Sequence, residues 1–237
     1  MVATAAMALF MTPVGAFMAS TSLHSPRTNH QRLCAALMQP TVSEVLDARD
    51  RLLTLLVTPS SSKSTSTSGG RDAPAAVRLK IKQCVATLEL SQSKADTLAF
   101  PKVWEAIDGD WTLKYSNNAA GLSVAVPSVV AGVRTPALTV VQRIDSRAGR
   151  VDHLLQLPYN RGVITLIHDA RVSSENRPAQ VAIDLHSVRL NGRIIKDRML
   201  RLPGPSFLRR GFFDITYVDE SLRISRGPYG ELRVFTR

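Results

Sequence analysis

Few side chains in this sequence are spaced for catalysis. The chain has no Gly-x-Ser-x-Gly elbow, no P-loop, no dinucleotide-binding glycine pattern and no pair of carboxylates that forms an acid–base motif. Ser206 lies in a loop-like Pro-Gly-Pro-Ser segment and has no nearby candidate base. Because no residue can be assigned as a nucleophile or a general base, we predict that the protein is not an enzyme and uses no cofactor.

Histidine and cysteine are also poorly spaced for a metal site. His153, His168 and His186 lie in strand-like runs without the spacing of helical ligands, so ordinary strand histidines are favoured over a three-histidine site. Cys34 and Cys84 are the only cysteines, and they form no Cys-x-x-Cys pair. We therefore predict no metal site and, because Cys34 lies in a segment that we expect to be cleaved, a single thiol in the mature protein.

The C-terminal stretch from Asp214 to Gly227 holds the most regularly spaced polar residues. Asp214 and Asp219 can accept backbone N–H bonds and so set up turns. In the strand that follows, alternation places Arg223 and Arg226 on opposite faces. An inward Arg226 would need a carboxylate partner, and the two aspartates are the nearest in sequence. The favoured interpretation is that these residues hold the last two strands together.

The charge balance indicates contact with an anionic surface without choosing one. The formal net charge is +11, which suits either nucleic acid or acidic lipid head groups. Basic residues are mostly interleaved with acidic ones, which fits a solvated surface equally well. Aromatic residues make up only 5% of the chain, which argues against stacking on bases. We predict no nucleic-acid partner.

The elements that would position these residues begin with a helical lead-in over residues 41–100. Apolar residues between Thr41 and Pro59 fall roughly on one helical stripe, and Ser43 suits the N-cap position. Residues 59–72 are Ser-rich and are expected to form a loop, and a second helix is expected from Ala75 to about Leu90. The polar faces of both helices carry charges of both signs, which favours packing on the rest of the fold over lying on a membrane.

Strand-like runs follow from Gly109 to the C-terminus, separated by turn signals. Asn191-Gly192 is the strongest of these signals, because a type I′ hairpin turn needs positive φ at both central positions. About eight short strands joined by hairpins indicate an antiparallel barrel or sandwich. The expected strands are Trp111–Ser116, Leu138–Asp145, Val151–Leu157, Val163–Val172, Gln180–Leu190, Ile194–Leu202, Ser221–Ser225 and Glu231–Thr236.

Residues 1–40 are expected to be a cleaved targeting segment. They contain no Asp or Glu, and residues 1–16 form an apolar leader that is too short for a membrane span. Residues 17–40 are rich in Ser and Thr and carry basic residues. With Ala16-Phe17 at the junction, the whole resembles the bipartite presequence of plastids derived from a eukaryotic endosymbiont. Simple secretion and a single-step transit peptide are the alternatives.

Three segments resemble the fibrillins, the plastid lipid-associated protein family. Ile107–Ser116 resembles their Gly-x-Trp-x-Leu-x-Tyr opening strand, which is similar to the Gly-x-Trp start of lipocalins. Val140–Asp145 resembles their Gln-x-Ile-Asp strand, and Gly211–Phe235 matches their C-terminal signature nearly throughout. The segment Pro127–Pro136 does not align with the family pattern. The resemblance implies a mainly β fold in which an antiparallel lipocalin-like β-barrel of about eight strands, residues 101–237, is preceded by two amphipathic helices.

The same resemblance implies a non-catalytic plastid protein that binds a hydrophobic lipid or isoprenoid at thylakoid or plastoglobule membranes. The cargo is left open among carotenoids, prenylquinones and glycerolipids. The alternative is a structural coat or adaptor of plastid lipid globules that holds no internal ligand. Arg223 and Arg226 could meet a lipid head group at the barrel mouth. The predicted lipid-binding residues are Trp111, Leu113, Tyr115, Val140, Ile144, Leu155, Leu166, Ile183, Tyr217, Arg223 and Arg226.

Overall fold

The computed structural model describes residues 39–57, 74–93, 98, 100–117, 139–157, 162–173, 180–192, 198–201, 210–228 and 230–237. Almost all of the expected targeting segment, the Ser-rich loop and the segment Pro127–Pro136 therefore lie outside the described residues. The helices are α2 (Val42–Val57), α3 (Ala75–Gln92) and the short α4 (Lys102–Ala106). The two long helices lie where the apolar stripes predict them.

The residue that caps the start of α2 is Thr41 and not the predicted cap, Ser43. The backbone N–H of Glu44 donates to Thr41 Oγ1 at 3.3 Å, and the Thr41 N–H donates back to Glu44 Oε2 at 2.7 Å. This reciprocal pair is a capping box, which satisfies two of the N–H groups that a helix start leaves free. Thr41 is favoured over Ser43 because only Thr41 has a glutamate three residues later.

Nine strands follow among the described residues, and every pairing between them is antiparallel. They are β1 (Gly109–Ser116), β2 (Thr139–Asp145), β3 (Arg150–Leu157), β4 (Gly162–Ser173), β5 (Gln180–Gly192), β6 (Arg198–Arg201), β7 (Arg210–Val218), β8 (Leu222–Arg226) and β9 (Leu232–Thr236).

Eight of these strands close into a ring. The order runs β4-β3-β2-β1-β9-β8-β7-β5, and β5 pairs back onto β4, while β6 adds to the side of β5. Closure gives each of the eight strands a partner strand on both sides, which is how a lipocalin-like barrel limits edge-to-edge association. The predicted fold class, a mainly β antiparallel lipocalin-like sheet preceded by two helices, is confirmed.

Two strand predictions are wrong. Asn191 and Gly192 are not a hairpin turn but the end of β5, where they pair with Val163 and Gly162 of β4. A Cβ on Gly162 would collide with the Asn191 backbone, so a glycine lets the two strands approach this closely. The second error is the omission of β7, because the turn expected at Asp214 falls inside this strand.

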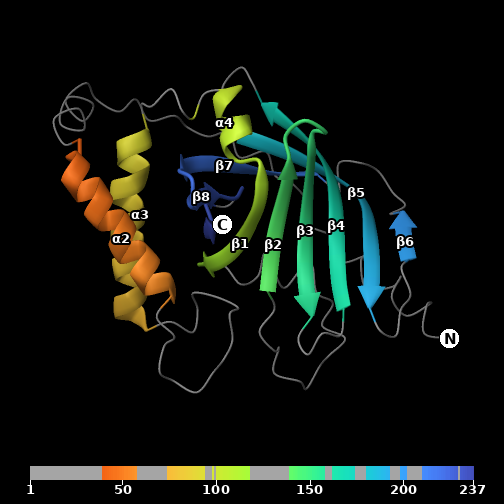
Figure 1. Ribbon diagram of the computed structural model, residues 1–237, viewed down its shortest axis with the longest axis horizontal. Helices are drawn as coiled ribbons and strands as arrows, with labels where there is room; N and C mark the ends of the chain where they lie inside the picture. The colour runs from red at the N-terminus through yellow and green to blue at the C-terminus, as the bar shows by residue number, and fades with distance from the viewer. Residues whose placement is uncertain are drawn as a thin grey trace, which may run out of the picture.

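The helices and the sheet enclose two separate apolar cores. The outer core lies between α2, α3 and the outside of the sheet, with α2 and α3 standing side by side against it (Figure 1). The inner core lies inside the ring and is closed at one end by α4, whose Val103 packs there with Ile107 and Trp111. The indole N–H of Trp111 donates to the Ile107 carbonyl at 2.7 Å, which ties this closure together.

Two β-bulges decide which residues enter each core. The register of β1 shifts between Leu113 and Tyr115, and that of β7 shifts between Ile215 and Tyr217. A bulge inserts one residue into a strand, so every later side chain changes face. Leu113 and Ile215 therefore belong to the inner core, and the two tyrosines belong to the outer core.

Candidate functional site

The interior of the ring receives most of the predicted site residues. Trp111, Ile144, Leu113 and Ile183 belong to or pack on the inner core. Strand pairing places four more of the predicted site residues on the inner face: Val140, Leu155, Leu166 and Arg223.

Three predicted site residues lie on the outer face instead. Tyr115 and Tyr217 are buried against the helices because the bulges at Lys114 and Thr216 reverse the alternation. Arg226 points outward from β8 and forms a bidentate ion pair with Glu89 of α3, in which both N–O distances are 2.8 Å. Its partner is thus neither Asp214 nor Asp219, and Arg223 and Arg226 do not share one binding surface.

The inward side chains form rows around the ring, and we call each row of residues that pair across adjacent strands a rung. The rung farthest from α4 is apolar and consists of Val140, Leu155, Ile164 and Leu190. The rung nearer α4 mixes polar and apolar side chains, namely Trp111, Gln142, His153, Leu166 and Val188. Leu113, Ile164, Leu166 and Ile183 are only partly buried although they face inward.

A chain of polar groups crosses the mixed rung. Arg223 Nη2 donates to Gln142 Oε1, which leaves the Gln142 amide nitrogen to donate to His153 Nε2 at 2.8 Å. His153 in turn lies 3.4 Å from His168, measured between their Nδ1 atoms. His153 therefore accepts at Nε2 and carries its proton on Nδ1, because a protonated Nε2 would face the N–H of Gln142.

Burial acts on both histidines of this chain. It lowers the pKa of His153 well below its ordinary value, and the charges of Arg233 and Arg223 lower it further, as would a protonated His168. Burial also lowers the pKa of His168, against bonds to the Val151 and Leu166 carbonyls that favour the charged form. Both rings are thus held neutral near pH 7.

Arg223 is the charged group at the centre of the interior. Its exposed fraction is 0%, and its guanidinium carbon lies 5.0 Å from the ring centre of Trp111 and 4.3 Å from that of Phe235. Burial, with the nearby charges of Arg237 and Arg233, lowers the pKa of Arg223 to about 9, which leaves it cationic at neutral pH. Its Nε and Nη1 atoms have no hydrogen-bond partner among the described residues.

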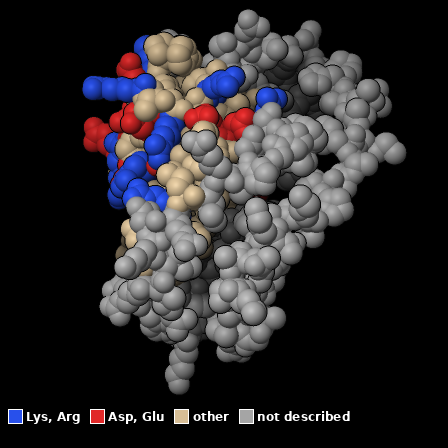
Figure 2. Space-filling view, turned by 90° about the vertical axis from the view of Figure 1, so that its right-hand side faces the viewer, with Lys and Arg blue, Asp and Glu red and all other residues tan. Residues whose placement is uncertain are grey.

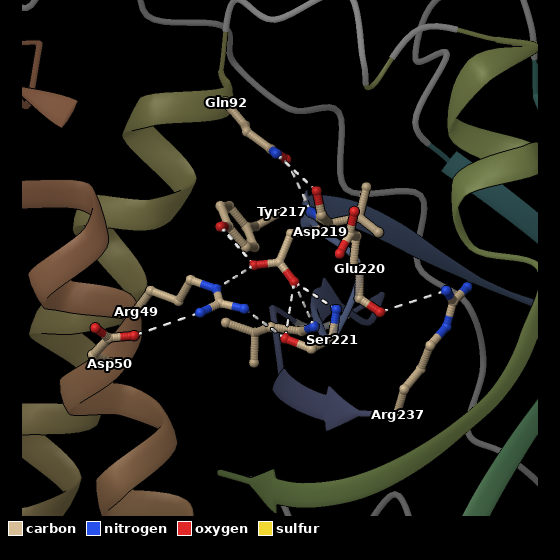
Figure 3. A network of polar contacts seen from close by, with 10 residues as sticks. Arg49, Asp50, Gln92, Tyr217, Asp219, Glu220, Ser221 and Arg237 are labelled. Carbon is tan, nitrogen blue, oxygen red and sulfur yellow. Dashed lines mark hydrogen bonds and ion pairs between the residues drawn. The ribbon is translucent and has the colours of Figure 1, made fainter.

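A second polar network joins the helices to the outside of the sheet (Figure 3). Asp219, in the turn between β7 and β8, accepts from Arg49 of α2 at 2.8 Å and from the Tyr217 hydroxyl at 3.0 Å. Its other oxygen accepts from the backbone N–H groups of Ser221 and Leu222, each at 2.7 Å. This network is fully partnered at Asp219, so we assign it to holding the helices in place.

Sequence reasoning missed Gln142, His153 and His168 as parts of the interior. A usable signal was present for all three, because each is a polar residue two positions from an apolar residue that faces inward on the same strand. For His168 that residue is Leu166, and the bulge at His186 lies on β5 and leaves the alternation of β4 intact.

Comparison with known proteins decides the family. The sequence model of the PAP_fibrillin family matches residues 61–236, which include α3, α4 and every strand. This chain is a member of the PAP_fibrillin family. The resemblance of its three strand motifs to the fibrillins is thereby confirmed.

A curated relative of this PAP_fibrillin protein carries a plastid name. The chain is 27% identical over 150 residues to plastid-lipid-associated protein 6, chloroplastic, of Arabidopsis thaliana. The alignment covers 55% of this chain and 52% of the relative, so the chain spans about half the length of the relative it matches. No solved structure matches the chain.

Two further observations concern metal ligands and membrane-spanning helices in the described part of this fibrillin. No group of three or more His, Cys, Asp or Glu residues in it is placed to hold a metal ion, and His186 lies apart from the other two histidines, beside Asp169. Within the same part, no helix is both long and apolar enough to cross a membrane.

Charge on the fibrillin's surface is mixed where it can be followed. The face seen in Figure 2 shows Lys and Arg side chains interspersed with Asp and Glu over the residues it describes. The described residues of that face therefore form no continuous basic stripe of the kind that tracks a nucleic-acid backbone.

Proposed function

We propose that this fibrillin is a non-catalytic plastid protein that binds one hydrophobic lipid or isoprenoid molecule inside the ring of strands, at the thylakoid or plastoglobule membrane. The observation that carries the proposal is the set of inward-facing apolar side chains that remain partly exposed, such as Leu113 and Leu166. Such side chains would lose contact with water on binding an apolar tail. Each CH₂ group buried there contributes about 0.8 kcal/mol.

The plastid location rests on two supports. The relative from Arabidopsis thaliana is named chloroplastic, and residues 1–40 resemble a bipartite plastid presequence. The division into a presequence, a helical lead-in over 41–100 and a lipid-binding domain over 101–237 belongs to the same proposal. The net charge of +11 suits a membrane surface that carries anionic lipids.

A matched pair of tryptophan substitutions on β4 tests the internal ligand. Leu166 and its neighbour Thr165 are both partly buried, but they point to opposite faces of the strand. Leu166→Trp should fill the interior and reduce binding of a fluorescent fatty-acyl probe at least tenfold, whereas Thr165→Trp should leave binding within about twofold. Equal effects of the two substitutions, or no probe binding by the unaltered protein, would overturn the proposal.

The second candidate function is a coat or adaptor, and exposed apolar side chains on the helices favour it. Val42 and Leu46 on α2 are 78% and 54% exposed, and Leu79 on α3 is 58% exposed. Val42→Ser with Leu46→Ser should weaken flotation with plastid-lipid vesicles if the helices do the binding. If vesicle flotation is unchanged while Leu166→Trp abolishes probe uptake, the internal-ligand function stands alone.

A further inference from the structure

Arg223 poses an energetic problem within the described part of the protein. A fully buried charge costs several kcal/mol unless it is paired and its hydrogen-bond donors are satisfied. A guanidinium carries five N–H donors, of which one lies on Nε and two on Nη1. Those three donors meet no acceptor among the described residues, while the only partner found is the neutral Gln142 side chain on Nη2.

Neighbouring charges worsen this problem. The charged groups that act on Arg223 are Arg237 and Arg233, which are both cationic. Arg233 faces inward as the partner of Ser225 and is compensated by Glu231, at 2.7 Å. None of the ion pairs between described residues includes Arg223. The core of the interior thus carries one positive charge that nothing described there balances.

The surroundings of Arg223 restrict how a ligand could reach it. The guanidinium lies over the rings of Trp111 and Phe235, and the ring centre of Phe213 is 6.0 Å away, so aromatic side chains surround the group. The unpartnered N–H groups of Nε and Nη1 lie on different edges of the guanidinium. An anionic oxygen can therefore accept from Nη1 while Nη2 keeps its bond to Gln142.

We propose that Arg223 binds the carboxylate of a single-tailed lipid acid whose apolar chain lies along the rung of Val140, Leu155, Ile164 and Leu190. This inference rests on the proposed function, because it specifies the head group of the ligand held inside the ring. One carboxylate balances the one excess charge, whereas a phosphate monoester brings about −1.5 to −2. The head group lies inward and the tail points away from α4.

Displacement of a fluorescent polyene fatty acid by a matched set of 14-carbon amphiphiles tests the head group. Myristic acid should displace the probe from the unaltered protein about tenfold to hundredfold more tightly than tetradecanol, the effect expected of charge-assisted hydrogen bonds. Arg223→Met, which keeps an apolar side chain of similar length, should remove this preference by weakening the acid and not the alcohol. The control is Arg143→Met, on the outer face of β2, which should change neither.

The outcomes separate this inference from the proposed function. Equal affinity for acid and alcohol in the unaltered protein would overturn the carboxylate site and leave the apolar interior in place. Absence of binding by either compound would overturn the proposed function itself. Tighter binding of tetradecyl phosphate than of myristic acid would also overturn the carboxylate site and identify a phosphate head group as the ligand.

A measurement on the unaltered protein tests the same contact even if Arg223→Met does not fold. The carboxyl carbon of ¹³C-labelled myristate reports by its chemical shift whether the bound acid is ionised. A carboxylate held by Arg223 should stay ionised below pH 4, since an adjacent cation lowers the pKa of a carboxyl group. Titration of the bound acid at or above its ordinary range would contradict the proposed contact.

Discussion

Asp219 is the residue on which the contact between α2 and the sheet converges. Burial raises the pKa of Asp219, but bonds from Arg49, from two backbone N–H groups and from Tyr217 outweigh it and lower the pKa overall. The ionised carboxylate shapes the turn before β8 and also holds the arginine of α2. A single side chain thus joins a local turn to a contact across 170 residues of sequence.

Replacing Asp219 should therefore cost more than removing an ordinary surface ion pair. We expect Asp219→Ala to lower the free energy of unfolding by about 3 kcal/mol, because it leaves two backbone N–H groups without an acceptor and removes the ion-pair partner of Nε of the partly buried Arg49. Asp110→Ala is the control, since Asp110 and Arg143 form an equally close pair whose side chains are 52% and 54% exposed. That change should cost at most about 1 kcal/mol. Urea denaturation of both variants checks the difference, and equal losses would contradict it.

At the scale of elements, α3 has one stripe that packs on the sheet and another face in solvent. Its buried residues are Ile81, Cys84, Val85 and Leu88. Next to this stripe, Glu89 pairs with Arg226 of β8, so the helix is fixed to the sheet by apolar and ionic contacts together. The outer core is therefore part of the folded unit.

Truncating α3 on its two faces should have very different effects. Leu88 is 0% exposed and Leu79 is 58% exposed on the same helix. Leu88→Ala should lower the free energy of unfolding by about 2–5 kcal/mol through the lost burial and the cavity left behind. Leu79→Ala should change it by less than about 0.5 kcal/mol. A loss near zero for Leu88→Ala in thermal or urea unfolding would show that α3 does not fold cooperatively with the sheet.

At the scale of the whole molecule, the closed ring places titratable groups in its interior. His153 and His168 stay neutral when folded because their pKa values are lowered, mainly by burial. The unfolded chain takes up protons on both rings below about pH 6.5, whereas the folded protein does not. Stability is therefore greatest above this pH and falls as the pH drops below it.

Unfolding midpoints measured between pH 7.5 and 5 should reveal this dependence. Each histidine can contribute at most about 1.4 kcal/mol of stability loss per pH unit in that window. His153→Gln should reduce the slope, because one of the two groups no longer titrates. An unaltered slope in His153→Gln would contradict the proposed neutral state of His153.

Patterns along the chain were enough to predict the class of the fold and the family. Apolar stripes located α2 and α3, and alternation located most strands, because both signals depend only on neighbours along the chain. The motifs around Trp111, Gln142 and Tyr217 identified the fibrillins, and alternation correctly placed Arg223 and Arg226 on opposite faces.

Only the tertiary structure decided which of these residues meet. Tyr115 and Tyr217 changed sides through bulges whose positions depend on the partner strand, which alternation within one strand cannot reveal. Arg226 forms its ion pair with Glu89 of α3, which lies 137 residues away in sequence. The unbalanced charge of Arg223 is not predictable from one strand, because the partners of a buried charge come from every strand around it. Ring closure alone brings those strands together.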